Sequence, residues 1–167
     1  EPDWVKRGSG EYGMAEERHI YGMGAAFPTE EQDAGALAKQ QARAELTRQV
    51  GGWTQAVNER MVDELSEYFE NGEEAAPSFF AQATQEVPSA VAERGEVRSR
   101  WNCGVTGEAF CLMAVTEARA ASVYKNHVAE LVDEQGSDVL QIKPEEFVSF
   151  LRGKDLAESG PTGDLSN

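Results

Sequence analysis

The chain has 167 residues, enough for one domain with a hydrophobic core of its own. Hydrophobic residues make up 40% and charged residues 27%, a globular composition that excludes a wholly disordered chain. Thirty acidic against fifteen basic residues give a net charge of −15. This excess keeps the chain soluble and opposes binding of nucleic acid or anionic lipid through the bulk surface. No stretch of sequence reaches the roughly 20 apolar residues that span a bilayer.

The first strand follows a polar start. Residues 1–18 contain glycines and scattered apolar anchors, which predicts an extended N-terminal arm lying on the domain. The run "HIYGMGAA", residues 19–26, predicts a short strand. Gly22 and Gly24 lie on the same face of this strand. Glycine weakens a strand unless something approaches closely, so we expect a helix to cross that face at short distance.

A long helix is predicted next. Thr29 and Gln32 resemble a capping box, and the following residues are rich in Ala, Gln, Glu and Leu. The helical pattern extends from 30 to about 70. Gly51 and Gly52 lie in the middle of this run, which leaves either one continuous helix or two pieces hinged at the glycines.

Apolar residues repeat every three or four positions along this predicted helix. Such a stripe either faces the core or serves as an association seam. The candidate interaction surface consists of Trp53, Val57, Met61 and Leu65.

A β-hairpin is predicted in the second half of the chain. Residues 70–78 contain Gly72 and Pro77 and read as a break, followed by a short helix over 78–86 that Pro88 ends. Residues 96–103 then alternate in polarity, and residues 109–116 are apolar on both faces, so they form two strands joined by a turn.

The two cysteines of the chain lie in this hairpin. If the turn centres on Gly107, Cys103 faces Cys111 and Trp101 faces Met113. Directly opposed residues are close enough for a disulfide after a modest adjustment, and we predict a Cys103–Cys111 bridge. The alternative is two buried free thiols that act as small hydrophobic groups.

Two amphipathic helices complete the pattern, one after Thr116 and one over "PEEFVSFLRG". The expected fold is α+β, with a single domain over 19–152 and a flexible tail over 153–167. A small three-stranded sheet has the long helix packed on one face, with the C-terminal helices added. The strands are expected at about 19–26, 96–103 and 109–116.

No catalytic constellation is recognisable. His19 and His127 have no partners at metal-ligand spacing, and the H-E-x-x-H motif is absent. Nucleophile and phosphate-loop motifs are also missing, and paired carboxylates are too common in so acidic a chain to single out two. We therefore predict a protein that is not an enzyme, without catalytic, cofactor-binding or metal-binding residues. A hydrolase with unrecognised carboxylates is the weaker alternative.

Several segments together resemble a known family. They are "PDWV", "IYGMGAA", "AKQQARAELTRQV" and "VRSRWN…GEAFCLMAV", which fall within residues 2–116. The order resembles the FlgP-like small bacterial outer-membrane lipoproteins, relatives of the twenty-kilodalton lipoprotein antigen of Helicobacter. The family's helix motif maps to Ala38, Ala42, Arg43 and Leu46. Its later strands map to Trp101, Gly107 and residues 110–115.

The resemblance implies a helix laid on a small sheet and a lipoprotein of the cell envelope, facing the periplasm. Glu1 would follow a removed signal and lipid-anchor segment, so the only membrane contact would be that anchor. The implied role is structural or in assembly, with the flagellum as one setting, through self-association or a protein partner. The alternative is a monomeric periplasmic accessory module that binds and regulates an envelope protein. The helical segments after 116 have no counterpart in the family pattern.

Overall fold

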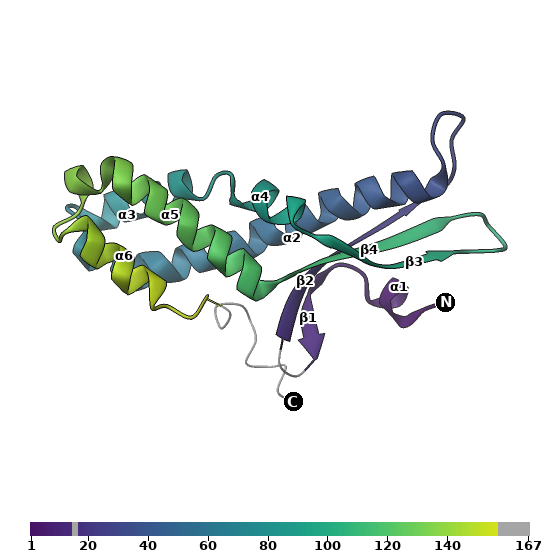
Figure 1. The fold of residues 1–167 in the computed structure, drawn as a ribbon, viewed down its shortest axis with the longest axis horizontal. Coiled ribbons are helices and arrows are strands. Elements are labelled where there is room, and N and C mark those ends of the chain that lie inside the picture. Colours follow the sequence, from purple (N-terminus) through teal and green to yellow (C-terminus); the bar gives the residue numbers. More distant parts are fainter. Residues whose placement is uncertain (15–16, 157–167) are drawn as a thin grey trace. The chain divides into compact units, whose positions relative to one another are not determined.

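A computed structural model describes residues 1–14 and 17–156. The chain divides into two compact units. Unit 1 comprises Glu1–Gly51 and Pro88–Ala120, and unit 2 comprises Gly52–Val87 and Ala121–Asn167. Figure 1 labels the helices and strands. Two of the helices, α2 (Ala34–Leu65) and α5 (Glu117–Val139), contribute residues to both units. The fold class is α+β, as predicted.

Unit 1 is built on a four-stranded antiparallel sheet in the order β1-β2-β4-β3. The strands are β1 (Gly10–Met14), β2 (Glu17–Ala26), β3 (Glu96–Asn102) and β4 (Ala109–Thr116). Strand β4 lies between β2 and β3 and is buried along almost its whole length on both faces, in agreement with its apolar sequence. The three predicted strands are therefore present, and β1 adds a fourth.

The expected extended arm is wrong for most of residues 1–14. Residues Asp3–Arg7 form a short helix, α1, and β1 pairs with the start of β2, from Gly10 opposite Tyr21 onward. Between α1 and β1, Ser9 Oγ accepts a hydrogen bond of 2.8 Å from the backbone N–H of Met23. The arm carries few apolar residues, so its strand is stabilised mainly by backbone pairing, which periodicity does not reveal.

The glycines of β2 allow α2 to lie directly on the sheet. A Cβ atom at Gly22 would overlap the backbone of Ala42 and Leu46, and one at Gly24 would overlap the backbone of Ala38 and Ala42. The predicted close crossing is confirmed. Ala38, Ala42 and Leu46 are fully buried where the helix meets the strand.

Helix α2 begins later than the sequence predicted and does not break. The side chain of Asp33 caps it, since Oδ1 accepts a 2.7 Å hydrogen bond from the N–H of Ala36. Thr29 instead makes a local turn, accepting a 3.0 Å bond from the N–H of Gln32. The helix continues through Gly51 and Gly52 because the buried residues on either side hold both halves to their cores.

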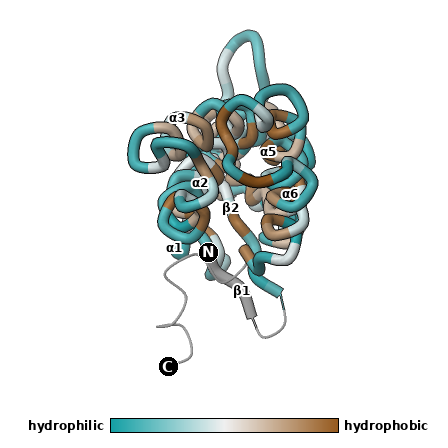
Figure 2. The backbone as a smooth tube through the Cα atoms, turned by 90° about the vertical axis from the view of Figure 1, so that its left-hand side faces the viewer, coloured by the Kyte–Doolittle hydropathy of each residue, from teal (hydrophilic) through white to brown (hydrophobic). Residues whose placement is uncertain are grey.

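Unit 2 is helical. It contains the second half of α2, the 3₁₀ turn Ser66–Tyr68, α3 (Gly72–Ala83), most of α5 and α6 (Pro144–Arg152). Hydrophobic and hydrophilic residues alternate along α3, α5 and α6 (Figure 2). At the centre of the unit, Phe69 packs against three aromatic rings, those of Phe79, Phe80 and Phe147, at centroid distances of 5.3, 5.9 and 5.4 Å.

The predicted break at 70–78 is shorter than expected, because the chain leaves helical structure only over 69–71 and α3 already starts at Gly72 and includes Pro77. Proline removes the hydrogen bond to the carbonyl of Glu73, but Pro77 and Glu73 are both exposed, so water can satisfy that carbonyl. Pro88 does not end a helix either. It is the second residue of α4 (Val87–Glu93), where its missing N–H is not needed.

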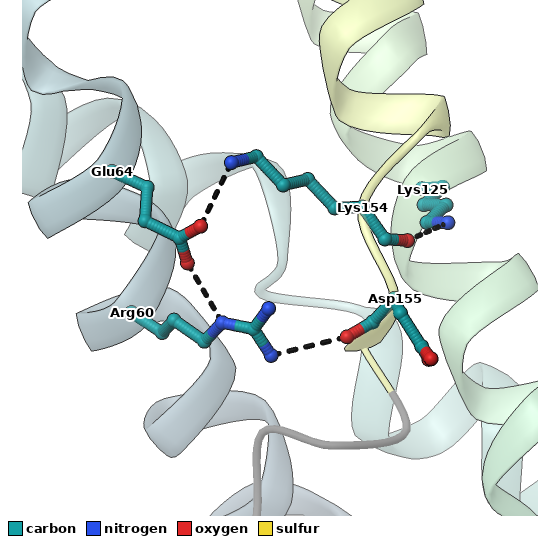
Figure 3. A network of polar contacts seen from close by, with 5 residues as sticks. All are labelled: Arg60, Glu64, Lys125, Lys154 and Asp155. Atoms are coloured by element: carbon teal, nitrogen blue, oxygen red, sulfur yellow. Dashed lines mark hydrogen bonds and ion pairs between the residues drawn. The ribbon is translucent and has the colours of Figure 1, made fainter.

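The start of the expected flexible tail is anchored in unit 2. Lys154 Nζ donates a 2.7 Å hydrogen bond to Glu64 Oε1, and Arg60 Nη1 donates one of 3.1 Å to the carbonyl of Asp155 (Figure 3). Lys125 Nζ donates to the carbonyl of Lys154, and Leu156 is buried. Residues 157–167 of the expected tail lie outside the described residues.

Candidate functional site

The predicted interaction surface is part of the core. Trp53, Val57, Met61 and Leu65 are each 1% exposed or less. The Trp53 ring meets the Tyr124 ring edge-on, with centroids 6.1 Å apart. This prediction is wrong, because helices of unit 2 that are distant in sequence cover the stripe. Of the two explanations for the stripe, core burial is the correct one.

The predicted disulfide is also wrong, because the hairpin register differs from the expected one. Arg100 lies opposite Cys111, and Trp101 lies opposite Phe110. Cys103 starts the turn, where its N–H donates a 2.8 Å bond to the carbonyl of Glu108. Arg100 and Cys111 are directly opposed, so their side chains lie on the same face of the sheet. Side chains alternate between the two faces along a strand, and Cys103 is three residues beyond Arg100. The side chain of Cys103 is therefore directed to the opposite face from that of Cys111. Both cysteines are free thiols.

The two thiols have different environments. The pKa of Cys103 lies below its usual value, because the Thr106 hydroxyl and the backbone N–H groups of Thr106 and Val105 stabilise the thiolate. Burial raises the pKa of Cys111. Cys103 is therefore the more reactive thiol, but nothing beside it completes a redox pair.

A chain of partly buried hydrogen bonds, which the sequence did not reveal, crosses unit 2. Tyr124 OH donates a 2.7 Å hydrogen bond to Asn58 Oδ1, and Asn58 Nδ2 donates one of 2.8 Å to Thr84 Oγ1. Thr84 Oγ1 in turn donates a 2.7 Å bond to the carbonyl of Phe80. Burial raises the pKa of the Tyr124 hydroxyl far above its usual value. The hydroxyl is thus a fixed neutral donor, and we assign the chain a structural role.

The histidines also divide by environment. His127 Nδ1 lies 2.9 Å from the carbonyl of Val123, one helical turn away, which is a local structural contact. His19 lies on β2 with its ring 5.7 Å from that of Tyr21, and it lines a cavity. Among residues 1–14 and 17–156, no group of three potential ligand residues could hold a metal ion.

Two exposed apolar side chains lie at one end of the sheet. Phe27 follows the last residue of β2 and is 54% exposed, and Val105 is 95% exposed in the turn between β3 and β4. They share this end because Ala26 pairs with Ala109, where β4 begins. We call Phe27 and Val105 the apolar tip. Acidic side chains flank both loops, namely Glu30, Glu31, Asp33 and Glu108.

A cavity of about 250 Å³ lies at the opposite end of the same sheet, where β2 begins and β4 ends. Three arginines line it, each from a different element: Arg94 after α4, Arg98 in β3 and Arg119 in the first turn of α5. We call this cavity the arginine pocket. Its wall also includes His19 and two carboxylates, Glu17 and Glu96.

Each arginine is held at the pocket by its backbone. The pairing of β3 with β4 shifts between Val97 and Ser99, so Arg98 is the extra residue of a bulge, a feature that re-aims side chains. Thr116 Oγ1 accepts a 3.1 Å bond from the N–H of Arg119 and thereby sets the start of α5. The backbone N–H of Arg94 donates a 3.0 Å hydrogen bond to the carbonyl of Val91.

A buried ion pair lies next to the pocket residues in sequence. Arg18 Nε is 3.5 Å from Glu117 Oε1, and the Glu117 side chain is only 1% exposed. Arg18 Nη2 also donates a 3.3 Å hydrogen bond to the carbonyl of Glu11. This pair joins the start of β2 to the start of α5, and it holds both elements that flank the pocket.

Within the described part of the chain, no helix is both long and apolar enough to cross a bilayer. Comparisons with models of protein families, with curated proteins and with solved structures found no match to this chain. The FlgP-like resemblance therefore stays a prediction.

Neither the apolar tip nor the arginine pocket was predicted. Phe27 and Val105 stand alone in their loops, and the three arginines are separated by unrelated residues. The available signal was the turn composition around Val105, a large apolar residue among Gly, Thr and Glu. The pocket had no local signal, because strand pairing assembles it.

Proposed function

We propose that the protein is a non-enzymatic component of the bacterial cell envelope that works by binding a protein partner through the apolar tip. The observation that carries the proposal is the exposure of Phe27 and Val105 at the same end of one sheet. Burial of a fully exposed side chain of this size contributes about 1.5–3 kcal/mol, so Val105, at 95% exposed, can contribute most of this range and Phe27, at 54%, about half of it. Two such anchors on one rigid end of a sheet supply the centre of a small interface.

The charges around the tip define the partner. Glu30, Glu31 and Asp33 are exposed beside Phe27, and Glu108 closes the turn that carries Val105. A complementary surface has an apolar socket with a basic rim, which speeds association and excludes acidic competitors. Such a rim rejects a second copy of this chain, whose net charge is also −15.

The envelope setting rests on the resemblance. In its support, α2 lies directly on Gly22 and Gly24 of β2, which is the helix-on-sheet arrangement that the resemblance implies. On this basis the protein is a lipid-anchored periplasmic protein of the outer membrane, and the flagellum is one setting for its partner.

The geometry favours an accessory module with a different protein as partner over a self-assembling ring. The stripe from Trp53 to Leu65, which would have served as the seam between copies, is buried. Light scattering after size-exclusion chromatography tests this choice. We expect 18.2 kDa at all protein and salt concentrations. A stable multiple of this mass would contradict the choice of a different partner.

A site-specific crosslink tests the tip itself. A photoreactive phenylalanine analogue replaces Val105 in the full-length protein, expressed in its own host, and Glu93, an exposed residue of α4, is the matched control position. We expect one discrete product in the envelope fraction from position 105, none from position 93, and loss of the product with Phe27→Ser. Equal products at both positions, or none at 105, would overturn the proposal.

A further inference from the structure

We propose that the arginine pocket is a binding site for a singly charged oxyanion of a small ligand, either a carboxylate or a phosphate group that carries one negative charge. This inference is independent of the apolar tip, which lies at the other end of the sheet. Guanidinium groups present paired N–H donors that match the oxygen spacing of carboxylates and phosphates. Three of them around a cavity of about 250 Å³ can approach such a group from several sides.

The three guanidinium groups have no competing partner within the described residues. No hydrogen bond or ion pair of the side chains of Arg94, Arg98 or Arg119 occurs among residues 1–14 and 17–156. In contrast, Arg18, Arg48 and Arg60 each pair with a carboxylate. The N–H donors of Arg94, Arg98 and Arg119 are therefore available to a ligand.

The local charge runs against that of the whole chain. Acidic residues outnumber basic ones two to one in the sequence, yet arginines outnumber carboxylates three to two at the pocket. The positive charges of the three arginine side chains repel one another, so holding them at one site costs free energy. A bound anion offsets this repulsion. An isolated arginine on an acidic surface would normally pair with a neighbouring carboxylate.

The two carboxylates set the charge of the ligand. Three arginines against Glu17 and Glu96 leave a formal charge of +1 from the arginines and carboxylates together. A monoanion neutralises this charge, whereas a polyanion such as nucleic acid would be repelled by the carboxylates and by the acidic chain. The three arginines are exposed, so binding is modest in strength and weakens as salt rises.

Two-dimensional NMR of the whole chain at low ionic strength provides the test, with the arginine Nε–H resonances as direct reporters. The probes are acetate and inorganic phosphate at about pH 6, where most of the phosphate is the monoanion, with chloride at equal ionic strength as the reference. We expect saturable shifts of the Arg94, Arg98 and Arg119 resonances and of the amides of residues 114–119. Tighter binding of phosphate identifies a phosphate ligand, and equal or tighter binding of acetate identifies a carboxylate. Shifts no larger than those with chloride would overturn the proposal.

Variants separate a built site from general charge. Arg98→Gln should weaken binding about ten-fold, equal to the roughly 1.4 kcal/mol of one charge-assisted contact. Arg43→Gln is the matched control, because Arg43 is exposed on α2, outside the pocket, and the charge change is the same. Glu96→Gln should strengthen binding several-fold. Equal effects of the two arginine variants, or weaker binding with Glu96→Gln, would refute the site, and thermal unfolding confirms that each variant is folded.

Discussion

Replacement of Tyr124 by phenylalanine tests the partly buried hydrogen-bond chain of unit 2. The ring still packs edge-on against Trp53, so only the hydroxyl is lost. Asn58 Oδ1 then loses the donor that lies 2.7 Å away. An acceptor without a partner costs about 1–3 kcal/mol when it is fully buried. Asn58 is only partly buried, so we expect the free energy of unfolding at pH 7 to fall by about 1 kcal/mol, the lower end of this range.

The pH dependence of this difference gives a second, sharper measurement. Burial raises the pKa of Tyr124 above its unfolded value of about 10, so the unfolded state releases the proton first. The stabilisation from the neutral hydroxyl is complete below pH 10 and is lost as the pH rises above it. The wild-type advantage over Tyr124→Phe should therefore shrink by about 1.4 kcal/mol per pH unit above pH 10.

Urea unfolding of both proteins from pH 7 to 11, followed by circular dichroism, measures both effects. The other tyrosines are present in both chains, so their titration cancels in the difference. A difference that stays constant from pH 8 to 11 would refute the buried neutral hydroxyl. A stability at pH 7 equal to that of the wild type would refute the hydrogen bond to Asn58.

Three further predictions concern close packing, the thiols and the C-terminal anchor. Gly22→Ala should destabilise the protein by about 1–3 kcal/mol, because the added Cβ meets the backbone of α2. Gly51→Ala should stabilise it by up to about 1 kcal/mol, because the space around Gly51 is open. Urea unfolding measures both free energies. Thiol titration of the purified protein should find two free thiols. Mass spectrometry should find that Cys103 is alkylated at pH 8 at least about ten-fold faster than Cys111. A disulfide between the two cysteines would instead support the pairing that the sequence predicted. Leu156→Ala should cost about 2–5 kcal/mol, since the side chain is fully buried, and an unchanged unfolding midpoint would show that residue 156 is not anchored.

The pocket and the tip show why the candidate sites were beyond prediction. Arg94, Arg98 and Arg119 meet only because β3 and β4 pair antiparallel with a bulge and α5 follows β4 directly. A bulge shifts the register by one residue and leaves no local pattern. The same pairing separates Cys103 from Cys111. In the observed register Arg100 lies opposite Cys111, so the Cys103 side chain is on the other face of the sheet.

The sequence by itself determined the α+β class, the strand at 109–116, the long helix and its close crossing of Gly22 and Gly24. These features follow from interactions between residues near one another in the chain, so periodicity and composition report them. Only the tertiary structure decided whether the Trp53 to Leu65 stripe was core or surface and how the hairpin was registered. The stripe is buried by helices distant in sequence, such as α5, which brings Tyr124 against Trp53. The register depends on the turn after Cys103 and on the bulge at Arg98, and neither leaves a periodic pattern in the sequence.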